Sequence, residues 1–382
     1  MTASKPSAYV PPPHAETWGA ARPCDVGLDA AKLTEAADFA LASDSPWPRS
    51  FHYSDGRYVG IVEWNEKGPW SDVSGPVRPR GGPAGLVLKG GQIVAEWGDT
   101  NRCDMTFSVA KSYLAVLTGL AVADGLIPSI DSRVGETVPG PWFESAHNAP
   151  ITWRHLLTQT SEWQGELWGK SDQVDHFRSL GGDNARKGDK RDLQTPGAYY
   201  EYNDVRVNLL AFCLLQRFGR PLPEVLRARI MDPIGASPEW EWHGYETSWV
   251  EIGGRRVQSV SGGAHWGGGM FIGARDHARL GLLIARRGRW GDRQVLPADW
   301  VDQMLSPSPT NASYGLLWWL NCGTARHRSA PATSVFALGA GNNMIWIDPD
   351  HDLVTVLRWI DKTAVDGFLK RLLAAATPAS GT

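Results

Sequence analysis

Apolar side chains recur every three or four positions in four segments of the chain, which is the spacing of a helix with one buried face. This pattern predicts helices over residues 28–42, 108–123, 274–287 and 364–376. Gly125 follows the second segment and marks its expected end, because glycine just after a periodic run favours termination of a helix. Helices are therefore expected from the beginning of the chain to its end.

Short runs rich in β-branched and aromatic residues predict strands near both ends of the chain. In GLVLKGGQIVAEWGD, residues 85–99, two such runs flank Gly90 and Gly91. They predict a hairpin, because glycine supplies the positive φ that tight turns need. The other predicted strands lie at 58–64, 314–321, 334–338, 343–347 and 353–359.

The middle of the chain, residues 130–250, is predicted to be mainly helical or irregular. Strands near both ends with helices between them predict an α/β (α+β) fold, in which distant segments form one antiparallel sheet and a helical region is inserted. We expect an extended arm with little packing over 1–24, a sheet domain formed by 25–105 and 255–382, and a mainly helical domain over 106–254.

Two segments lack a clear periodic pattern. Residues 45–85 are rich in Trp, Gly and Pro, and a segment this long without regular structure is either a functional cover or a passive surface wrap. Residues 183–192 alternate in charge, which is typical of a solvated loop. Both are candidates for the rim of a cleft.

Composition supports a folded protein and excludes one class of partner. Hydrophobic residues make up 42% of the chain and charged residues 21%. The 38 Lys and Arg against 41 Asp and Glu give a net charge of -3, without the basic excess that nucleic acid selects. No run approaches the roughly 18 apolar residues of a membrane span, and the N-terminus does not resemble a secretory signal. We expect a cytoplasmic protein without nucleic-acid or membrane partners.

Cysteine spacing gives no sign of a metal site, and tryptophan is unusually frequent. The four cysteines lie far apart without CxxC spacing, so we expect buried free thiols. The chain has 19 tryptophans. Those in stretches rich in Gly and polar residues suit either the core or the wall of an apolar pocket: Trp163, Trp168, Trp266, Trp318 and Trp319.

An SxxK motif, Ser108 to Lys111, lies where irregular sequence passes into an apolar helix. At a helix start these side chains share one face, and the free backbone N–H groups there stabilise negative charge. The motif therefore offers a nucleophile, a base and part of an oxyanion hole. Lysine accepts a proton only where burial or nearby positive charge favours the neutral amine. The alternative is that Ser108 is a helix cap and Lys111 a surface charge.

Other catalytic designs match the sequence less well. No GxSxG elbow occurs, and no HExxH motif is present among ten dispersed histidines. A GxGxxG phosphate loop in a strand-to-helix context is also absent. We expect His155 and His265 to be structural, with lining of a cleft as the alternative. Neither a cofactor nor a metal is expected.

Five segments in order resemble the penicillin-recognising serine hydrolases, which include class C β-lactamases, DD-peptidases, family VIII carboxylesterases and 6-aminohexanoate-dimer hydrolase. The resemblance covers about residues 27–375. ITWRHLLTQTSEW, for example, is similar to the family segment ITxRHLLTHTSGL. The matching segments are 90–127, 151–163, 196–212, 267–301 and 336–357.

The resemblance implies a β-lactamase/transpeptidase-like fold with the active site in a cleft between the two domains. Ser108 matches the acylated serine and Lys111 its partner. Tyr202 matches the tyrosine whose phenolic oxygen exchanges protons with the serine and the leaving group. Asp204 falls where many members have Asn, which leaves its contact near Lys111 open.

The third family triplet corresponds to residues 337–339. The N–H of Ala340 would then join that of Ser108 in the oxyanion hole. β-Lactamases and DD-peptidases normally begin this triplet with Lys or His, whereas Ala337 offers only a methyl group. Substrate contacts are expected from a set of five residues: Asp204, Trp163, Trp266, Trp318 and Gly339.

The expected function is hydrolysis of small or apolar carboxylic esters through a Ser108 acyl-enzyme, with Lys111 and Tyr202 transferring protons. The expected partner is a small ester or amide, and the chain is expected to be a monomer or homodimer. A linear-amide hydrolase is the main alternative. A weak β-lactamase and a catalytically silent binding protein are less favoured.

Overall fold

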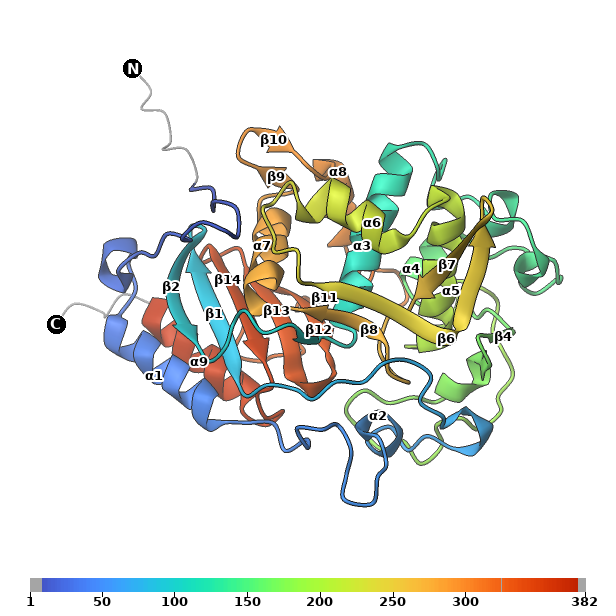
Figure 1. Cartoon of the computed structure of the whole chain (residues 1–382), viewed down its shortest axis with the longest axis horizontal. Helices are drawn as coiled ribbons and strands as arrows, with labels where there is room; N and C mark the ends of the chain where they lie inside the picture. The colour runs from blue at the N-terminus through green and yellow to red at the C-terminus, as the bar shows by residue number, and fades with distance from the viewer. Residues whose placement is uncertain (1–8, 324, 377–382) are drawn as a thin grey trace.

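A computed structural model describes residues 9–323 and 325–376, and its main sheet is assembled from both ends of the chain (Figure 1). The sheet is antiparallel, with strand order β11-β12-β13-β14-β1-β2. Its members are β1 (Ala84–Lys89), β2 (Gln92–Trp97), β11 (Trp319–Leu320), β12 (Val335–Gly339), β13 (Asn343–Asp348) and β14 (Leu353–Arg358). The predicted antiparallel sheet built from distant segments is confirmed.

The hairpin between β1 and β2 forms at the predicted glycines. Gly90 and Gly91 have φ of 59° and 90°, and Lys89 pairs with Gln92 across the turn. These are left-handed conformations that side chains disfavour. The tight turn therefore joins β1 directly to β2, the edge strand of the sheet.

Helices cover both faces of this sheet. Trp97 of β2 lies on the same face as Gly85, its partner in β1, and contacts Phe368. On the opposite face, Gly281 meets Val354. Phe368 belongs to α9 (Val365–Ala376), which packs on α1 (Ala30–Ala42), and Gly281 belongs to α7 (Ala274–Ala285). The predicted helices at 28–42, 274–287 and 364–376 are confirmed within a few residues of their ends.

The helical region is arranged around α3 (Val109–Ala123), which is buried on all sides from Val109 to Ala121. Because α3 is apolar all round, it forms the centre of the molecule rather than a surface layer. It packs against the end of the sheet at β12 and against α5. The other helices are α4 (Trp153–Leu157), α5 (Asp204–Phe218) and α6 (Leu222–Leu226), followed by a π-helical turn, Arg227–Met231.

A second antiparallel sheet, in the order β3-β8-β6-β7, corrects one sequence prediction. We expected residues 130–250 to be helical or irregular, but β6 (Glu241–Ile252) is the longest strand described. It turns at Gly253 and Gly254, both with positive φ, into β7 (Arg255–Val260). β3 (Asp104–Met105) and β8 (Gly269–Ile272) complete the sheet. β6 thus pairs across the expected boundary near residue 255, and the two-domain division stays a prediction.

The predicted strand at 58–64 is wrong, because this stretch contains the short helix α2 (Val59–Val62). The segment 45–85 as a whole is mostly irregular, as expected. Four short strands form two pairs in other loops: β4 (Glu166–Leu167) pairs with β5 (Lys170–Ser171), and β9 (Arg289–Trp290) pairs with β10 (Arg293–Gln294). The helix α8 (Ala298–Met304) follows.

The N-terminal arm packs more than predicted. Residues 1–8 of the expected arm lie outside the described residues, but Trp18 is buried and its Nε1 donates to Gly91 O at 2.9 Å. Ala20 forms a bridge to Ile93 of β2. The described part of the arm therefore closes one edge of the main sheet.

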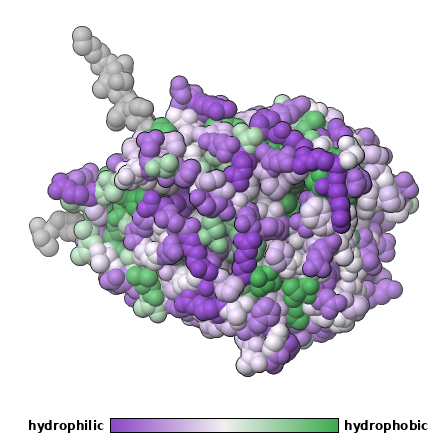
Figure 2. Space-filling view, viewed as in Figure 1, coloured by the Kyte–Doolittle hydropathy of each residue, from purple (hydrophilic) through white to green (hydrophobic). Residues whose placement is uncertain are grey.

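The surface, the cysteines and the lengths of the helices were each addressed by the sequence predictions. The face in Figure 2 is mainly hydrophilic, with hydrophobic residues in small groups.

All four cysteines are free, as predicted. Only Cys213 is also buried, whereas Cys24 is exposed and the other two are partly exposed. Among the described residues, no helix combines the length and apolar character needed to cross a membrane.

Candidate active site

The SxxK pair meets at the start of α3. Ser108 is the residue before the helix, Lys111 follows one turn later, and Lys111 Nζ lies 2.8 Å from Ser108 Oγ. Lys111 is 1% exposed, so the alternative of a surface lysine is wrong. The predicted nucleophile and its partner are therefore brought together at a helix N-terminus, where the positive end of the helix dipole stabilises negative charge.

The turn that presents Ser108 is fixed by Phe107. Phe107 has a φ of 50°, a conformation that costs energy for a bulky side chain and persists only when the surroundings enforce it. Its buried ring packs edge-on against Trp47, Phe51 and Trp359. The aromatic contacts therefore hold the backbone in the shape that directs Ser108 outward from the core.

Lys111 has three acceptors around its amine: Ser108 Oγ, Asp204 and the carbonyl of Gly262, the last at 3.3 Å. The pairing needs glycine next to it. A Cβ on Gly263 would lie 2.6 Å from Asp204 Oδ1 and 2.7 Å from Lys111 Nζ. Asp204, which falls where the resemblance led us to expect Asn, is thus a direct hydrogen-bond partner of Lys111.

Tyr202 lies beside the pair. Its ring centroid is 4.8 Å from Lys111 Nζ and 5.3 Å from the guanidinium carbon of Arg178. The other side of the ring stacks on Trp319, with centroids 5.8 Å apart. Among the described residues, none hydrogen-bonds its hydroxyl, which leaves that group available to a substrate.

The end of β12 passes directly along the backbone of the nucleophile. A Cβ on Gly339 would lie 2.1 Å from Thr106 O and 3.2 Å from Ser108 N. Ala340 follows at once, so its N–H and that of Ser108 come from adjacent segments. Ala337 is fully buried in the core, and its methyl group adds no polar contact to the site.

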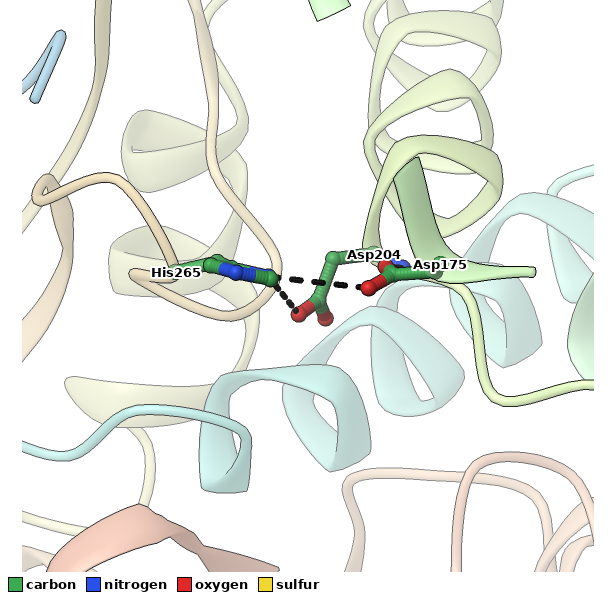
Figure 3. A group of neighbouring side chains, drawn as sticks. All are labelled: Asp175, Asp204 and His265. Carbon is green, nitrogen blue, oxygen red and sulfur yellow. Dashed lines mark hydrogen bonds and ion pairs between the residues drawn. The ribbon is translucent and has the colours of Figure 1, made fainter. Parts of the chain in front are cut away.

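Asp204 is the centre of a buried charge network. Its Oδ2 accepts from Arg178 at 2.7 Å and lies 3.1 Å from His265 Nδ1, and its backbone N–H donates to Asp175 at 2.7 Å (Figure 3). Burial alone would raise the pKa of Asp204, but Lys111 in its protonated form and the Arg178 cation hold that pKa well below its usual range. Asp204 is therefore a permanent anion beside the nucleophile.

The network extends beyond Asp204 to two carboxylates and another cation. Lys187 Nζ lies 2.8 Å from Glu66 Oε2 and 3.3 Å from Asp175 Oδ1. His265 Nε2 lies 2.6 Å from the same Glu66 oxygen, an ion-pair contact without hydrogen-bond alignment. These side chains are at most 1% exposed, so burial of each charge depends on its partner.

The trio in Figure 3 does not favour a metal ion. Asp175, Asp204 and His265 offer ligand atoms within 4.8 Å of one another. However, Arg178 lies 3.2 Å from Asp175 Oδ2 and already bridges the two carboxylates, and Lys187 lies on the other Asp175 oxygen. A divalent ion would add charge to a group whose anions are already paired.

An open cavity of about 330 Å³ adjoins Tyr202. Two charged residues of its wall are paired elsewhere, Arg178 with Asp204 and Glu201 with Arg191. The rest of the wall is largely aromatic or apolar: Phe177, Leu180, Tyr199, Tyr200, Tyr202 and Trp319, with Ser179 and Arg326. The aromatic rings of the wall offer contacts to an apolar substrate group, while polar and apolar atoms share the exposed wall about equally.

The expected pocket tryptophans lie elsewhere. Three of them are at most 1% exposed and lie in the core rather than in the wall of this cavity: Trp163, Trp266 and Trp318. Trp319, next to Trp318 in the chain, lines the cavity instead. Any substrate contact through these three stays a prediction. His155 caps α4 together with Thr152, which matches the structural role expected of it.

The two irregular segments meet over the site. Asn65 donates to Asn184 O at 3.1 Å, and Lys187 pairs with Glu66 as described. Most positions of 183–192 are exposed in an irregular loop, as expected, but Lys187 is fully buried and the Arg191 side chain is 8% exposed. The segment is attached to the site through its cations.

Sequence reasoning missed Glu66, Asp175, Arg178 and Lys187. They lie in irregular segments, where spacing does not say which charges will pair. One signal was present, since Asp175 and Arg178 are three positions apart and form an i,i+3 pair. The buried positions of Glu66 and Lys187 depend on long-range folding, and no local pattern marks them.

Comparisons with known proteins are consistent across sequence and structure. The Beta-lactamase family matches residues 80–373. The 6-aminohexanoate-dimer hydrolase of Paenarthrobacter ureafaciens is 23% identical over 303 residues, which are 71% of this chain and 70% of that protein.

Solved structures share the fold at low sequence identity. EstCE1, described as a hydrolase with promiscuous acyltransferase activity, has a TM-score of 0.58 at 14% identity, covering 91% of this chain and 99% of its own. A penicillin-binding protein homolog from Caulobacter crescentus has the same TM-score and identity, covering 94% and 99%. A putative 6-aminohexanoate-dimer hydrolase from Bacillus anthracis has 0.53 at 16%, covering 92% and 89%.

Proposed function

The chain belongs to the Beta-lactamase family of serine hydrolases, and from that membership we propose that it hydrolyses small or apolar carboxylic esters through an acyl-enzyme on Ser108. The observation that carries the proposal is the 2.8 Å contact between Ser108 Oγ and a buried Lys111 at the start of α3. A nucleophile in contact with a base is the arrangement that covalent catalysis requires.

In the acylation step, Ser108 Oγ attacks the ester carbonyl and its proton passes to the Lys111 and Tyr202 pair. The oxyanion is held by the N–H groups of Ser108 and Ala340. Collapse of the tetrahedral intermediate breaks the bond to the alcohol, which leaves with a proton from the same pair. Water then attacks the acyl-enzyme and releases the acid.

The oxyanion hole in this proposal is supported by the close passage of Gly339. Because an added Cβ on Gly339 would meet Thr106 O and Ser108 N, β12 passes beside the nucleophile, and the amide of Ala340 is the next one along the chain. A single donor of this kind is typically worth roughly 10²- to 10³-fold in turnover.

The preference for apolar esters is supported by the cavity and by Ala337. The aromatic wall next to Tyr202 suits an apolar acyl or alcohol group. Ala337 lacks the cation that many family members direct at a substrate carboxylate. A dedicated β-lactamase is therefore disfavoured.

A linear-amide hydrolase is the second candidate, and the relative from Paenarthrobacter ureafaciens is the observation that favours it. Amide cleavage demands stronger protonation of the leaving amine than ester cleavage, and the open Tyr202 hydroxyl is the group for that step. A silent binding protein is opposed by the intact contact of Ser108 with Lys111.

Matched substrates separate these functions. We would measure kcat/KM for p-nitrophenyl butyrate and for the p-nitroanilide of the same acid, with Ser108→Ala as the control. The proposal expects ester hydrolysis that depends on Ser108 and exceeds amide hydrolysis. Faster amide hydrolysis would establish the second candidate, and no Ser108-dependent turnover of either would favour a binding protein.

A further inference from the structure

His265 is held rigidly between two carboxylates in the loop before β8. It is 0% exposed, and its ring lies flat on Trp266, with centroids 4.0 Å apart and planes at 2°. The edge of Trp64 approaches from another side at 4.8 Å between centroids. The ring therefore has no freedom to turn its nitrogens away from the groups they face.

Both ring nitrogens face an acid. Nδ1 lies 3.1 Å from Asp204 Oδ2, and Nε2 lies 2.6 Å from Glu66 Oε2. The Nδ1 contact is a hydrogen bond, whereas the Nε2 contact is an ion-pair distance without hydrogen-bond alignment. A neutral imidazole would leave an uncharged ring between two buried carboxylates, and the imidazolium places a positive charge between them, so this arrangement fits a charged ring.

Charges in the network balance without the catalytic lysine. The anions are Glu66, Asp175 and Asp204, each buried. Arg178, Lys187 and the His265 imidazolium supply three positive charges to these three negative ones. A protonated Lys111 would be a fourth cation, and an unbalanced buried charge is costly.

Of the other charged groups near the ring, Asp175 favours a positive imidazole, whereas Lys170 and Arg178 are cations that are paired or bonded elsewhere. Asp175 Oδ1 lies 3.9 Å from Nδ1 and is already shared with Lys187. Lys170 lies 5.1 Å from the Trp266 ring centroid and donates to the Trp70 and Asp72 carbonyls. Arg178 lies over Trp64, with its guanidinium carbon 5.3 Å from the ring centroid. No further anion faces the ring among the described residues.

We propose that His265 is a positioning residue for catalysis. Its positive charge beside Asp204 takes the place of a positive charge on Lys111. The Lys111 amine therefore stays neutral and can accept the Ser108 proton. The proposal rests on the proposed function, since it requires Ser108 to be the nucleophile. Glu66 takes part by holding the second ring nitrogen.

The proton balance of the step is complete. The Ser108 O–H proton moves to neutral Lys111 as the bond from Ser108 Oγ to the carbonyl carbon forms. The resulting ammonium stays in contact with Asp204 until its proton returns to the leaving alcohol by way of Tyr202. His265 keeps both of its protons throughout, and no other reactant is needed.

The test is the pH dependence of kcat/KM for p-nitrophenyl butyrate in His265→Gln, between pH 6 and 9.5 with the uncatalysed rate subtracted. Without the positive charge of His265, Asp204 pairs with an ammonium at Lys111. The lysine must then lose its proton before it can accept the proton of Ser108. We expect the acidic limb of the profile to move up by roughly one pH unit or more. The rate at pH 7 then falls about tenfold or more and recovers at pH 9.5.

A second variant keeps the test decisive if His265→Gln does not fold. His265→Asn removes the same positive charge with a shorter side chain, and we expect a shift of the limb in the same direction. His351→Gln is the matched control, because His351 also pairs with a buried carboxylate, that of Asp348 at 2.8 Å, but lies at the turn between β13 and β14.

The outcomes are separable. An equal loss of rate at every pH, or an unchanged limb in both variants, would overturn the role of His265 while leaving the acyl-enzyme intact. If Ser108→Ala retains the wild-type rate, the proposed function itself fails. An unchanged profile for His351→Gln beside a shifted one for His265→Gln is the result that we expect.

Discussion

At the scale of single residues, position 339 has room for glycine only. We predict that Gly339→Ala lowers kcat about 10²- to 10³-fold, because a Cβ 2.1 Å from Thr106 O must displace β12 from the nucleophile and move the Ala340 N–H out of reach. The backbone of Gly339 is extended, with a φ of -130°, so alanine introduces no conformational strain of its own.

Gly181→Ala is the control for this prediction, since no atom lies within 4 Å of the added Cβ and its φ is not positive. Steady-state kinetics of the two variants, beside their melting temperatures, make the comparison. Wild-type turnover in Gly339→Ala would contradict the assignment of the oxyanion hole.

Tyr202→Phe keeps the ring and removes only the hydroxyl. We expect turnover to fall roughly 10²- to 10⁴-fold, the usual range for loss of a general acid or base. Stability should change little, because the described structure gives that hydroxyl no hydrogen bond to lose, whereas the stacking on Trp319 remains. Unchanged turnover with an unchanged melting curve would exclude the proton-transfer role.

The sequence predicted the residues of this site to different degrees. The sequence predicted Ser108 and Lys111 because their spacing is that of one helix turn. It predicted Tyr202 because the segment that contains it follows the SxxK segment in the order found in the family. Asp204 was placed in the site, but its direct pairing with Lys111 was not foreseen. Glu66 and Lys187 were missed, since a buried pair between residues 121 positions apart leaves no local pattern.

At the scale of elements, the charged segment 183–192 is attached to the interior by Lys187. We predict that Lys187→Met destabilises the protein by about 3–5 kcal/mol, because it removes the cation that Glu66 and Asp175 share and leaves the buried network with one negative charge uncompensated. Urea unfolding measures the change.

Lys190→Met is the matched control, because Lys190 is exposed, three positions away and in no ion pair among the described residues. Its free energy of unfolding should stay within about 0.5 kcal/mol of wild type. Equal stability of the two variants would show that the segment is only a surface loop.

Helices and strands were predicted correctly where the apolar residues followed a single spacing, either that of a helix or that of a strand. The helices near residues 30, 110, 275 and 365 have uninterrupted apolar spacing, and the strands at both ends alternate around glycine turns. β6 was missed although Trp242, Tyr245 and Ser248 are buried and a Gly253-Gly254 turn follows, because charged residues break its alternation. At 58–64 the aromatic content favoured a strand, while packing under the site produced a short helix.

At the scale of the whole molecule, buried ion pairs make the fold sensitive to acid. Burial would raise the pKa of Glu162, but Arg191 and Arg206 lower it to about 2, against an unfolded value of about 4.3. The unfolded chain therefore binds more protons between these values. The contribution of Glu162 to stability is complete above about pH 4.5 and is lost as the pH falls toward 2.

Glu162→Gln tests this behaviour. We expect the variant to be less stable than wild type at pH 7, with a difference that shrinks steadily as the pH falls from 4.5 to 2, because wild type alone loses the ionised carboxylate. Denaturant unfolding at several pH values measures it. A difference that stays constant over this range would contradict the ion-pair account.

The central claim is that Ser108 carries the acyl group during turnover, and intact mass tests it most directly. Wild type and Ser108→Ala would be quenched in acid during hydrolysis of p-nitrophenyl butyrate, weighed and digested. The account predicts a butyryl adduct on wild type alone, within the peptide that contains Ser108. If deacylation is faster than acylation, no adduct accumulates, and the account then predicts that Ser108→Ala loses turnover. Hydrolysis that persists in Ser108→Ala, or an adduct on another residue, would contradict it.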